Sequence, residues 1–102
     1  MAMKIEAARL LTYRTAWFID HKPGDTKEIT KYASMAKAYA ARTAIEVTDA
    51  AIQIYGGYGY VDSDLERFYR DARITDIVEG TGEIQRYIIA RESYREMNLP
   101  LP

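Results

Sequence analysis

The residues best suited to chemistry lie in the run from position 77 to 86, where Glu79 precedes Gly80 and Thr81. A helical pattern follows them, so this carboxylate lies at the start of a helix. A positioned carboxylate can act as a general base, and the glycine beside it lets a ligand approach the backbone closely. A structural interpretation also fits, because an acid at a helix N-terminus contributes about 0.3–1 kcal/mol through the helix dipole. The pattern alone leaves both interpretations open.

A second segment that could bind a ligand is the glycine cluster Gly56, Gly57 and Gly59, which follows Gln53. Glycine adopts left-handed conformations without steric cost, so Gly56 or Gly57 can simply end a helix. Alternatively, the bare backbone here approaches a ligand and the Gln53 side-chain amide adds hydrogen bonds. The cluster matches neither a phosphate loop nor a dinucleotide fingerprint, and it follows a predicted helix rather than a strand.

Three arginines, Arg67, Arg70 and Arg73, recur at three-residue spacing and therefore lie on one side of a predicted helix. One interpretation is an electrostatic clamp or a subunit contact, because arginine is favoured at such places. The other is a solvated face whose charges pair with nearby acids. Those acids are Glu66, Asp71 and Asp76.

Composition limits the classes of protein and of site. The 102 residues make room for one domain, and 14 basic against 15 acidic residues give no electrostatic footprint for nucleic acid or an anionic membrane. The chain has no cysteine and a single histidine, His21, which argues against a disulfide framework, a cysteine nucleophile and a metal site.

No apolar run approaches the roughly 18 residues that span a bilayer, and the N-terminus has no hydrophobic signal region. We expect no membrane partner and a location in the cytoplasm or the mitochondrial matrix.

Helical spacing of apolar residues runs through the chain and no segment alternates like a strand, so the sequence predicts an all-α fold. Four helices are expected, at residues 1–21, 25–55, 63–74 and 81–97. Capping boxes that begin with Asp25 and Ser63 mark two of the starts. The second helix would be about 45 Å long, which is more than one short partner can cover. We therefore expect a helical bundle and an oligomer.

The two longest predicted helices each have an apolar face. On the first helix it consists of Ile5, Ala8, Leu11, Thr15 and Phe18. On the second helix it consists of Ile29, Tyr32 or Ala33, Ala36, Ala40, Thr43, Val47, Ala50 and Ile54. The many alanines make this face thin, so neighbouring helices can approach closely.

Several motifs, in order along the chain, resemble the C-terminal helical domain of the acyl-CoA dehydrogenases. The most specific are Glu79-Gly80-Thr81, Ile84-Gln85-Arg86 and Ile89-Ala90-Arg91. The other matching segments are residues 4–11, 33–37, 51–57 and 66–73. The resemblance implies an up-and-down four-helix bundle in which residues 1–102 form this domain without its first helix. It also implies that the family's N-terminal helical domain and middle β domain are missing from the chain.

The resemblance also implies roles for individual residues. Glu79 matches the base that removes the α-hydrogen of an acyl-CoA thioester as a proton, while the β-hydrogen leaves as hydride to the flavin of FAD. Gly80 matches the small residue beside the substrate thioester. The residues matched to flavin contacts are Thr81, Gly82 and Glu83. Those matched to the adenosine-diphosphate part of FAD in a neighbouring subunit are Gln53, Ile54, Tyr55, Gly56 and Gly57.

The chain departs from the family pattern at Val78, where many relatives have a tyrosine, and in the loop at 61–65, which is one residue shorter and lacks proline. Val78 should alter the acyl pocket. The expected partners are further copies of the chain in a dimer or tetramer, the missing N-terminal part of the enzyme, and electron-transfer flavoprotein. Alone, the chain is expected to be inactive. The alternatives are a helical oligomerisation or interaction module without activity of its own, and a relative of the acyl-CoA oxidases.

Overall fold

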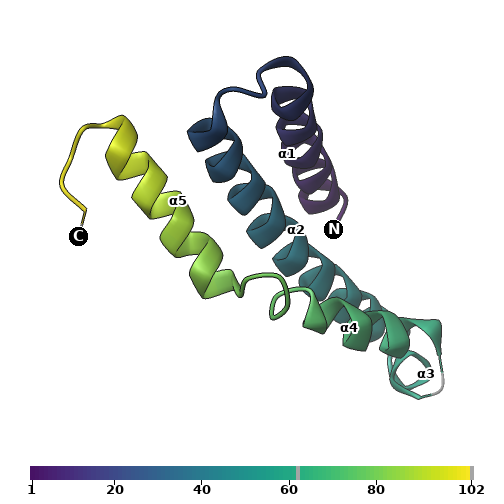
Figure 1. Cartoon of the computed structure of the whole chain (residues 1–102). Coiled ribbons are helices and arrows are strands. Elements are labelled where there is room, and N and C mark those ends of the chain that lie inside the picture. The colour runs from purple at the N-terminus through teal and green to yellow at the C-terminus, as the bar shows by residue number, and fades with distance from the viewer. Residues whose placement is uncertain (62, 102) are drawn as a thin grey trace.

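One helix of 30 residues, α2 (Thr26–Tyr55), is the element against which every other helix packs (Figure 1). The computed structural model describes residues 1–61 and 63–101, and these contain helices and no strand. The other helices are α1 (Ala2–His21), α3 (Gly57–Tyr60), α4 (Asp64–Ile74) and α5 (Gly82–Glu96). The all-α prediction is therefore confirmed, and the four predicted helices are present with ends that differ by a residue or so.

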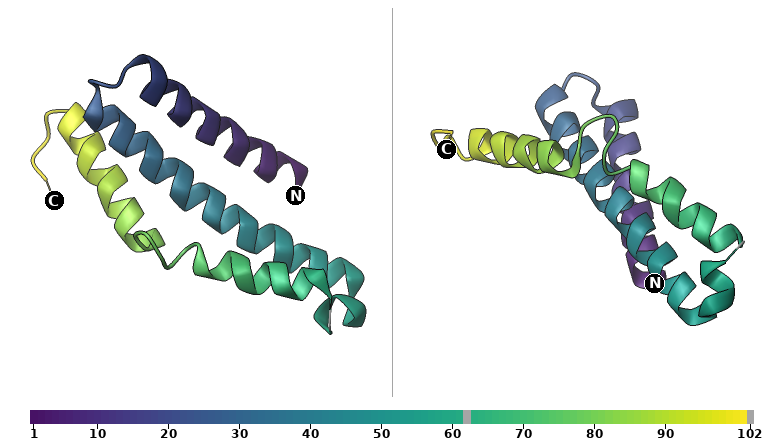
Figure 2. Two further views of the ribbon diagram at one scale, coloured as in Figure 1. Left: turned by 45° about the vertical axis from the view of Figure 1, so that its right-hand side comes forward. Right: turned by 90° about the horizontal axis from the view of Figure 1, so that it is seen from below.

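The helices form an open layer rather than a closed bundle. α1 runs antiparallel to α2, as shown by a hydrogen bond of 3.2 Å from the Thr15 hydroxyl to the Tyr32 carbonyl and by an ion pair between Lys4 and Glu46. α4 and α5 then follow one another back along a different side of α2 (Figure 2). Within the described ranges α1 contacts neither α4 nor α5. This arrangement agrees with the predicted four-helix-bundle domain that lacks one helix.

Local side-chain caps begin two of the helices. The Ser63 hydroxyl accepts a hydrogen bond of 3.4 Å from the Glu66 amide at the start of α4, and the Thr81 hydroxyl accepts one of 3.3 Å from the Ile84 amide at the start of α5. Each cap satisfies an amide that the first helical turn leaves without a partner. Asp25 occupies the predicted cap position of α2, but its side chain accepts no such hydrogen bond, so the capping box predicted there is not formed.

The buried apolar residues are mostly small. They are Ala8, Phe18, Ala36, Ala41, Ile45 and Ala72. Large apolar side chains on the outer faces of α1 and α5 remain open to solvent, among them Leu10 (60% exposed), Ile84 (51%) and Tyr87 (59%). Contiguous exposed apolar surface is often typical of faces that pack against another molecule. None of the helices described is long and apolar enough to cross a bilayer.

The predicted inner face of α2 is only partly right. Ala36 and Thr43 are buried, but Ala33 is exposed and Ile54 is 70% exposed. The buried positions that the prediction omitted are Lys31, Ser34, Ala41 and Ile45. The physical reason is that α1 covers one side of α2 while α4 and α5 cover another, so two faces are buried rather than one stripe.

The predicted inner face of α1 agrees better with the structure. Ala8, Thr15 and Phe18 are buried, whereas Ile5 is 40% exposed. Phe18 stacks on Tyr32 of α2 with ring centroids 5.0 Å apart. A single partner helix covers α1, so one stripe is enough to describe its burial.

Charged side chains connect α5 to α2. Lys31 of α2, whose side chain is 10% exposed, pairs with Glu96 of α5. On α5 itself, Glu92 is 3% exposed and accepts hydrogen bonds from Arg91 at 2.8 Å and from Arg95 at 2.9 Å. Burial acts to raise the pKa of Glu92, but the hydrogen bonds from the two guanidinium groups outweigh it and the pKa lies below its usual value.

Candidate functional site

Glu79 lies in the α4–α5 loop (residues 75–81), and its backbone has a left-handed conformation with φ of 58°. Residues other than glycine rarely adopt a positive φ, which costs about 1–3 kcal/mol unless the surroundings hold it. The next residue, Gly80, also has a positive φ, of 92°. These two successive residues form a turn between α4 and α5, and Glu79 is exposed there. A strained acidic residue in an exposed loop is a candidate for function rather than for folding.

Two side chains from different helices hold this turn. The Lys37 ammonium of α2 donates hydrogen bonds to the carbonyl oxygens of Val78 at 2.9 Å and Gly80 at 2.6 Å. The Gln85 side-chain amide of α5 donates to the carbonyl oxygens of Glu79 and Gly80, both at 3.3 Å. Three consecutive carbonyl groups therefore point toward two donors.

Gly80 and Gly82 both have neighbouring side chains close to the place of a Cβ atom, and Gly80 also has the positive φ that favours glycine. A Cβ atom at Gly80 would lie 2.5 Å from Nε2 of Gln85. A Cβ at Gly82, which is buried at the start of α5, would lie 2.6 Å from Oδ1 of Asp76. The Gly82 amide donates a hydrogen bond of 3.1 Å to the Asp76 carbonyl, which closes the loop. The glycines thus let the loop pack tightly at the mouth of α5.

Thr81 and Glu83 have local structural roles at the same helix end. Thr81 caps α5, as described above, and Glu83 lies exposed in the first turn. The backbone amide of Glu83, the Thr81 hydroxyl and the positive charges of Arg86 and Arg73 hold the pKa of the Glu83 carboxyl below its usual value. Because these polar side-chain groups already serve the helix end, a ligand here would mainly meet the backbone and the outer edge of the turn.

The segment predicted to meet adenosine diphosphate, Gln53–Gly57, lies at the far end of α2 and is exposed throughout. Gly56 has a positive φ of 63°, and a Cβ placed at Gly56 or Gly57 would meet nothing within 4 Å. The backbone here is therefore open to a ligand. The sequence predicts only that the glycines end the preceding helix. In the structure Gly56 ends α2, but residues 57–60 form a further helical turn, α3, so the prediction is corrected there.

Gly59 serves packing instead of binding. It is buried, and a Cβ there would lie 2.9 Å from Cβ of Tyr55 and 3.0 Å from the Ile52 carbonyl oxygen. Neither atom can rotate away, since both belong to or adjoin the backbone of α2. The three glycines of the cluster therefore differ in role: Gly56 turns the chain, Gly57 leaves open space, and Gly59 lets α3 approach α2.

The two predicted ligand segments do not form one site within this chain. Lys37, which contacts the Glu79 turn, and Gln53 are both on α2, sixteen residues or about 24 Å apart at 1.5 Å per residue. Figure 1 shows the same separation, with the α4–α5 loop beside the middle of α2 and α3 at its end. A single small ligand group therefore cannot touch both segments of one copy.

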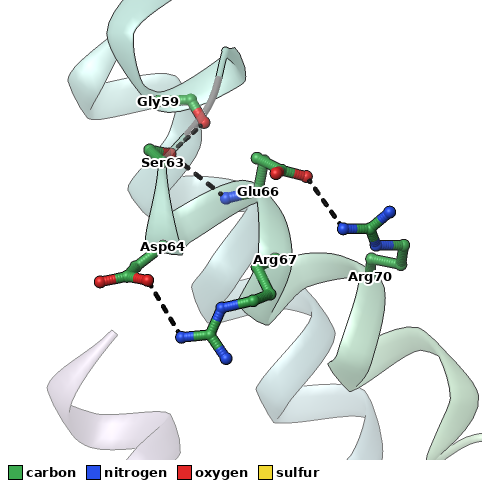
Figure 3. A network of polar contacts seen from close by, with 6 residues as sticks. All are labelled: Gly59, Ser63, Asp64, Glu66, Arg67 and Arg70. Atoms are coloured by element: carbon green, nitrogen blue, oxygen red, sulfur yellow. Dashed lines mark hydrogen bonds and ion pairs between the residues drawn. The ribbon is translucent and has the colours of Figure 1, made fainter.

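Two of the three arginines of α4 pair with acids of their own helix. Arg67 contacts Asp64 at 3.0 Å and Arg70 contacts Glu66 at 3.7 Å, and both arginine side chains are more than half exposed (Figure 3). These contacts agree with a solvated face, although the partner of Arg67 is Asp64 rather than any of the predicted acids. Exposed pairs of this kind contribute little to stability.

Comparison with known proteins identifies the family. Residues 1–94 match the sequence profile of the acyl-CoA dehydrogenase C-terminal domain. The chain belongs to this family. It is 50% identical over 96 residues to cyclohexane-1-carbonyl-CoA dehydrogenase of Geobacter metallireducens, covering 93% of this chain and 24% of the relative. It is 53% identical over 91 residues to the human mitochondrial short-chain specific acyl-CoA dehydrogenase, covering 88% of this chain and 21% of that enzyme.

A solved structure supports the fold of this acyl-CoA dehydrogenase domain. It comes from a study entitled "Electron transferring flavoprotein of Acidaminococcus fermentans: Towards a mechanism of flavin-based electron bifurcation" and superposes with a TM-score of 0.84 at 46% sequence identity. The match covers 93% of this chain and 24% of that chain. The chain thus spans about a quarter of the length of the relatives it matches.

Sequence reasoning located the acidic turn but missed two residues that hold it. Lys37 precedes Glu79 by 42 positions, and a lysine on a helix normally extends into solvent, so no local pattern marks it. Gln85 follows Glu79 by six positions and appears only as part of a family motif. Gln85 is distinguished by its burial, at 8% exposed, which no pattern along the sequence indicates because the buried residues of α5 include polar side chains.

Proposed function

We propose that this chain is the part of an FAD-dependent acyl-CoA dehydrogenase that carries the catalytic base, with Glu79 as that base. Glu79 takes the α-hydrogen of an acyl-CoA thioester as a proton. Bound FAD would supply the acceptor for the β-hydrogen, which would leave as hydride, so that loss of the proton and the hydride together would convert the Cα–Cβ single bond into a double bond. Gly80 lies beside the thioester because it has no side chain to fill the space.

The observation that carries this proposal is the left-handed backbone of Glu79 in an exposed loop held by Lys37 and Gln85. A capping acid needs no such strain, because an acid in an ordinary first turn already interacts with the helix dipole. A general base needs a fixed direction relative to the proton that it removes. Glu79 is exposed in this chain, so the exclusion of water that favours proton transfer has to come from substrate and from neighbouring domains or subunits.

The residues proposed for FAD divide into two groups by what they offer. Gln53, Gly56 and Gly57 fit the adenosine-diphosphate part, because the glycine backbone is unobstructed and the Gln53 side chain is exposed. Ile54 and Tyr55 are 70% and 65% exposed beside them and offer apolar contact. Thr81, Gly82 and Glu83 are proposed to meet the flavin through the outer edge of the turn that they build.

The proposed assembly is a homo-oligomer in which the C-terminal end of α2 faces the cofactor of a neighbouring subunit. Electron-transfer flavoprotein is the proposed acceptor of electrons. The exposed apolar faces of α1 and α5 support an assembly of some kind. The same faces favour a second candidate, a helical interaction module without chemistry. Size-exclusion chromatography with light scattering and a visible absorbance scan, with and without added FAD, separates the two: a colourless oligomer that ignores FAD favours the module.

A chimera tests the proposed base directly. In it, this chain replaces the matching 91-residue segment of the human short-chain relative. We expect Glu79→Gln to lower the turnover of a short-chain acyl-CoA by roughly 10²–10⁴-fold, the usual contribution of a general base. Flavin absorbance of the purified chimera should be unchanged, because the substitution keeps the shape of the side chain.

Two controls make the result specific. Glu6→Gln, on the exposed surface of α1, should leave turnover unchanged. Glu79→Asp keeps the carboxylate but shortens its reach, so part of the activity should remain. A Glu79→Gln chimera that binds flavin and turns over at the parent rate would show that Glu79 is not the base.

A further inference from the structure

The peptide groups around Glu79 are anchored one by one. Lys37 holds the carbonyl of Val78, which belongs to the peptide plane before Glu79, and that of Gly80, which belongs to the plane after Gly80. Gln85 holds the carbonyl of Glu79, in the plane between these two, and shares that of Gly80. Because each peptide group is rigid, fixing three consecutive planes fixes φ and ψ of both residues between them.

Lys37 is the stronger of the two anchors. Its hydrogen bonds, at 2.9 and 2.6 Å, are shorter than the two of 3.3 Å from Gln85, and its donor carries a full charge. Within residues 1–61 and 63–101 no carboxylate lies at ion-pair distance from Lys37. The ammonium is directed to the loop rather than to an acid.

The position of Lys37 on α2 makes it a rigid support. α2 is a continuous helix that contacts α1, α4 and α5, so its residue 37 has a defined place relative to all of them. An ammonium with three donors can hold two carbonyl groups at once, which a neutral apolar residue at this position could not do. The left-handed φ of Glu79 is therefore maintained from outside its own loop.

We propose that Lys37 is a positioning residue for Glu79: it holds the strained turn whose geometry directs the Glu79 carboxylate. The role as a positioner of a base rests on the function proposed above. The anchoring itself is a property of this chain alone, and it is measured without cofactor or substrate.

The test compares isotope-labelled 102-residue proteins by NMR. In the parent protein, the positive φ of Glu79 gives a strong intraresidue cross-peak between its amide and α protons. In Lys37→Met, which keeps an unbranched side chain of nearly the same length but removes the charge and the donors, this cross-peak should weaken and the chemical shifts of Glu79 and Gly80 should move. Exchange of the Gly82 amide with solvent should become roughly tenfold or more faster, since two charge-assisted hydrogen bonds are lost.

The matched control is Lys27→Met, an exposed lysine on the same helix, which should leave all of these signals unchanged. Lys37→Arg keeps the charge and several donors and should restore part of the parent spectrum. A folded Lys37→Met protein with the Glu79 cross-peak and Gly82 exchange of the parent would overturn the proposal. Should Lys37→Met not fold, Lys37→Gln, which removes the charge and shortens the side chain but keeps it polar, takes its place, and parent-like Glu79 and Gly80 signals in that variant would overturn the proposal as well.

A second readout separates positioning from mere folding. In the chimera, Lys37→Met should lower kcat roughly 10–100-fold while KM changes little, as expected for a misdirected catalytic group. An unchanged kcat alongside a relaxed NMR spectrum would refute the positioning role. If Glu79→Gln leaves the rate of the chimera unchanged, the proposed function fails, yet the NMR comparison still decides whether Lys37 anchors the turn.

Discussion

Replacing Gly80 by alanine tests whether the turn beside Glu79 needs glycine for conformation and space together. The φ of 92° at Gly80 lies in a region that side chains with a Cβ adopt at a cost of about 1–2 kcal/mol. The new Cβ would also lie 2.5 Å from Nε2 of Gln85, so that amide must move and release its two hydrogen bonds. Each bond contributes about 0.5–1.5 kcal/mol, and these are long. We expect a loss of roughly 2–4 kcal/mol in the free energy of unfolding.

The glycines at the end of α2 provide matched controls. Gly56 has a positive φ of 63° but open space around its Cβ position, so Gly56→Ala should cost only the conformational part, about 1–2 kcal/mol. Gly57 lies in α3 with neither a positive φ nor a neighbour within 4 Å. Gly57→Ala should therefore leave stability unchanged or raise it by up to about 1 kcal/mol, because alanine favours helix.

The assay is urea unfolding followed by far-UV circular dichroism, with the midpoint and slope fitted for each variant. The expected order of stability is Gly57→Ala, then the parent, then Gly56→Ala, then Gly80→Ala. If the dependence of the unfolding free energy on urea concentration is the same in all variants, each variant exposes the same surface on unfolding, and the midpoints compare stability alone. A Gly80→Ala protein as stable as the Gly57→Ala protein would refute the geometry of the turn and the contact with Gln85.

Two further predictions concern the helix caps and the buried acid of α5. Thr81→Ala removes a cap that accepts a hydrogen bond at the start of α5, and it should lower the free energy of unfolding by about 1 kcal/mol. Asp25→Ala, at the start of α2, removes a side chain that accepts no such bond and should lower that free energy by about a few tenths of a kcal/mol at most, as measured by urea unfolding. The pKa of Glu92 is held below its ordinary value of 4.5 in the folded chain, so its contribution to stability is present above that value and is lost as pH falls through the lower, folded pKa. Glu92→Gln should thus flatten this part of the dependence of the urea midpoint on pH, and a profile identical to the parent's would contradict the buried contact with Arg91 and Arg95.

The candidate site shows how far local sequence signals reach. The position of Glu79 and Gly80 directly before α5 could be predicted, because the helical pattern expected from residue 81 follows them at once. The left-handed turn and the Thr81 cap were not predicted. The roles proposed for Gln53–Gly57 could be read only through the family resemblance. The hydrogen bonds from Lys37 to this turn could not be predicted from sequence, since they join positions 41 and 43 residues apart.

The sequence by itself determined α1, α2, α4 and α5, although not the helical turn α3. The physical reason is that the hydrogen bonds of a helix join residues four apart and its caps, such as Ser63 and Thr81, act within three residues. The tertiary structure decided which faces of those helices are covered. α2 packs on two sides, so Ser34 and Ala41 are buried while Ile54 is not. It also decided that the Lys37 ammonium meets the Glu79 turn, because burial and long-range hydrogen bonds depend on which elements approach one another rather than on the neighbours of a residue along the chain.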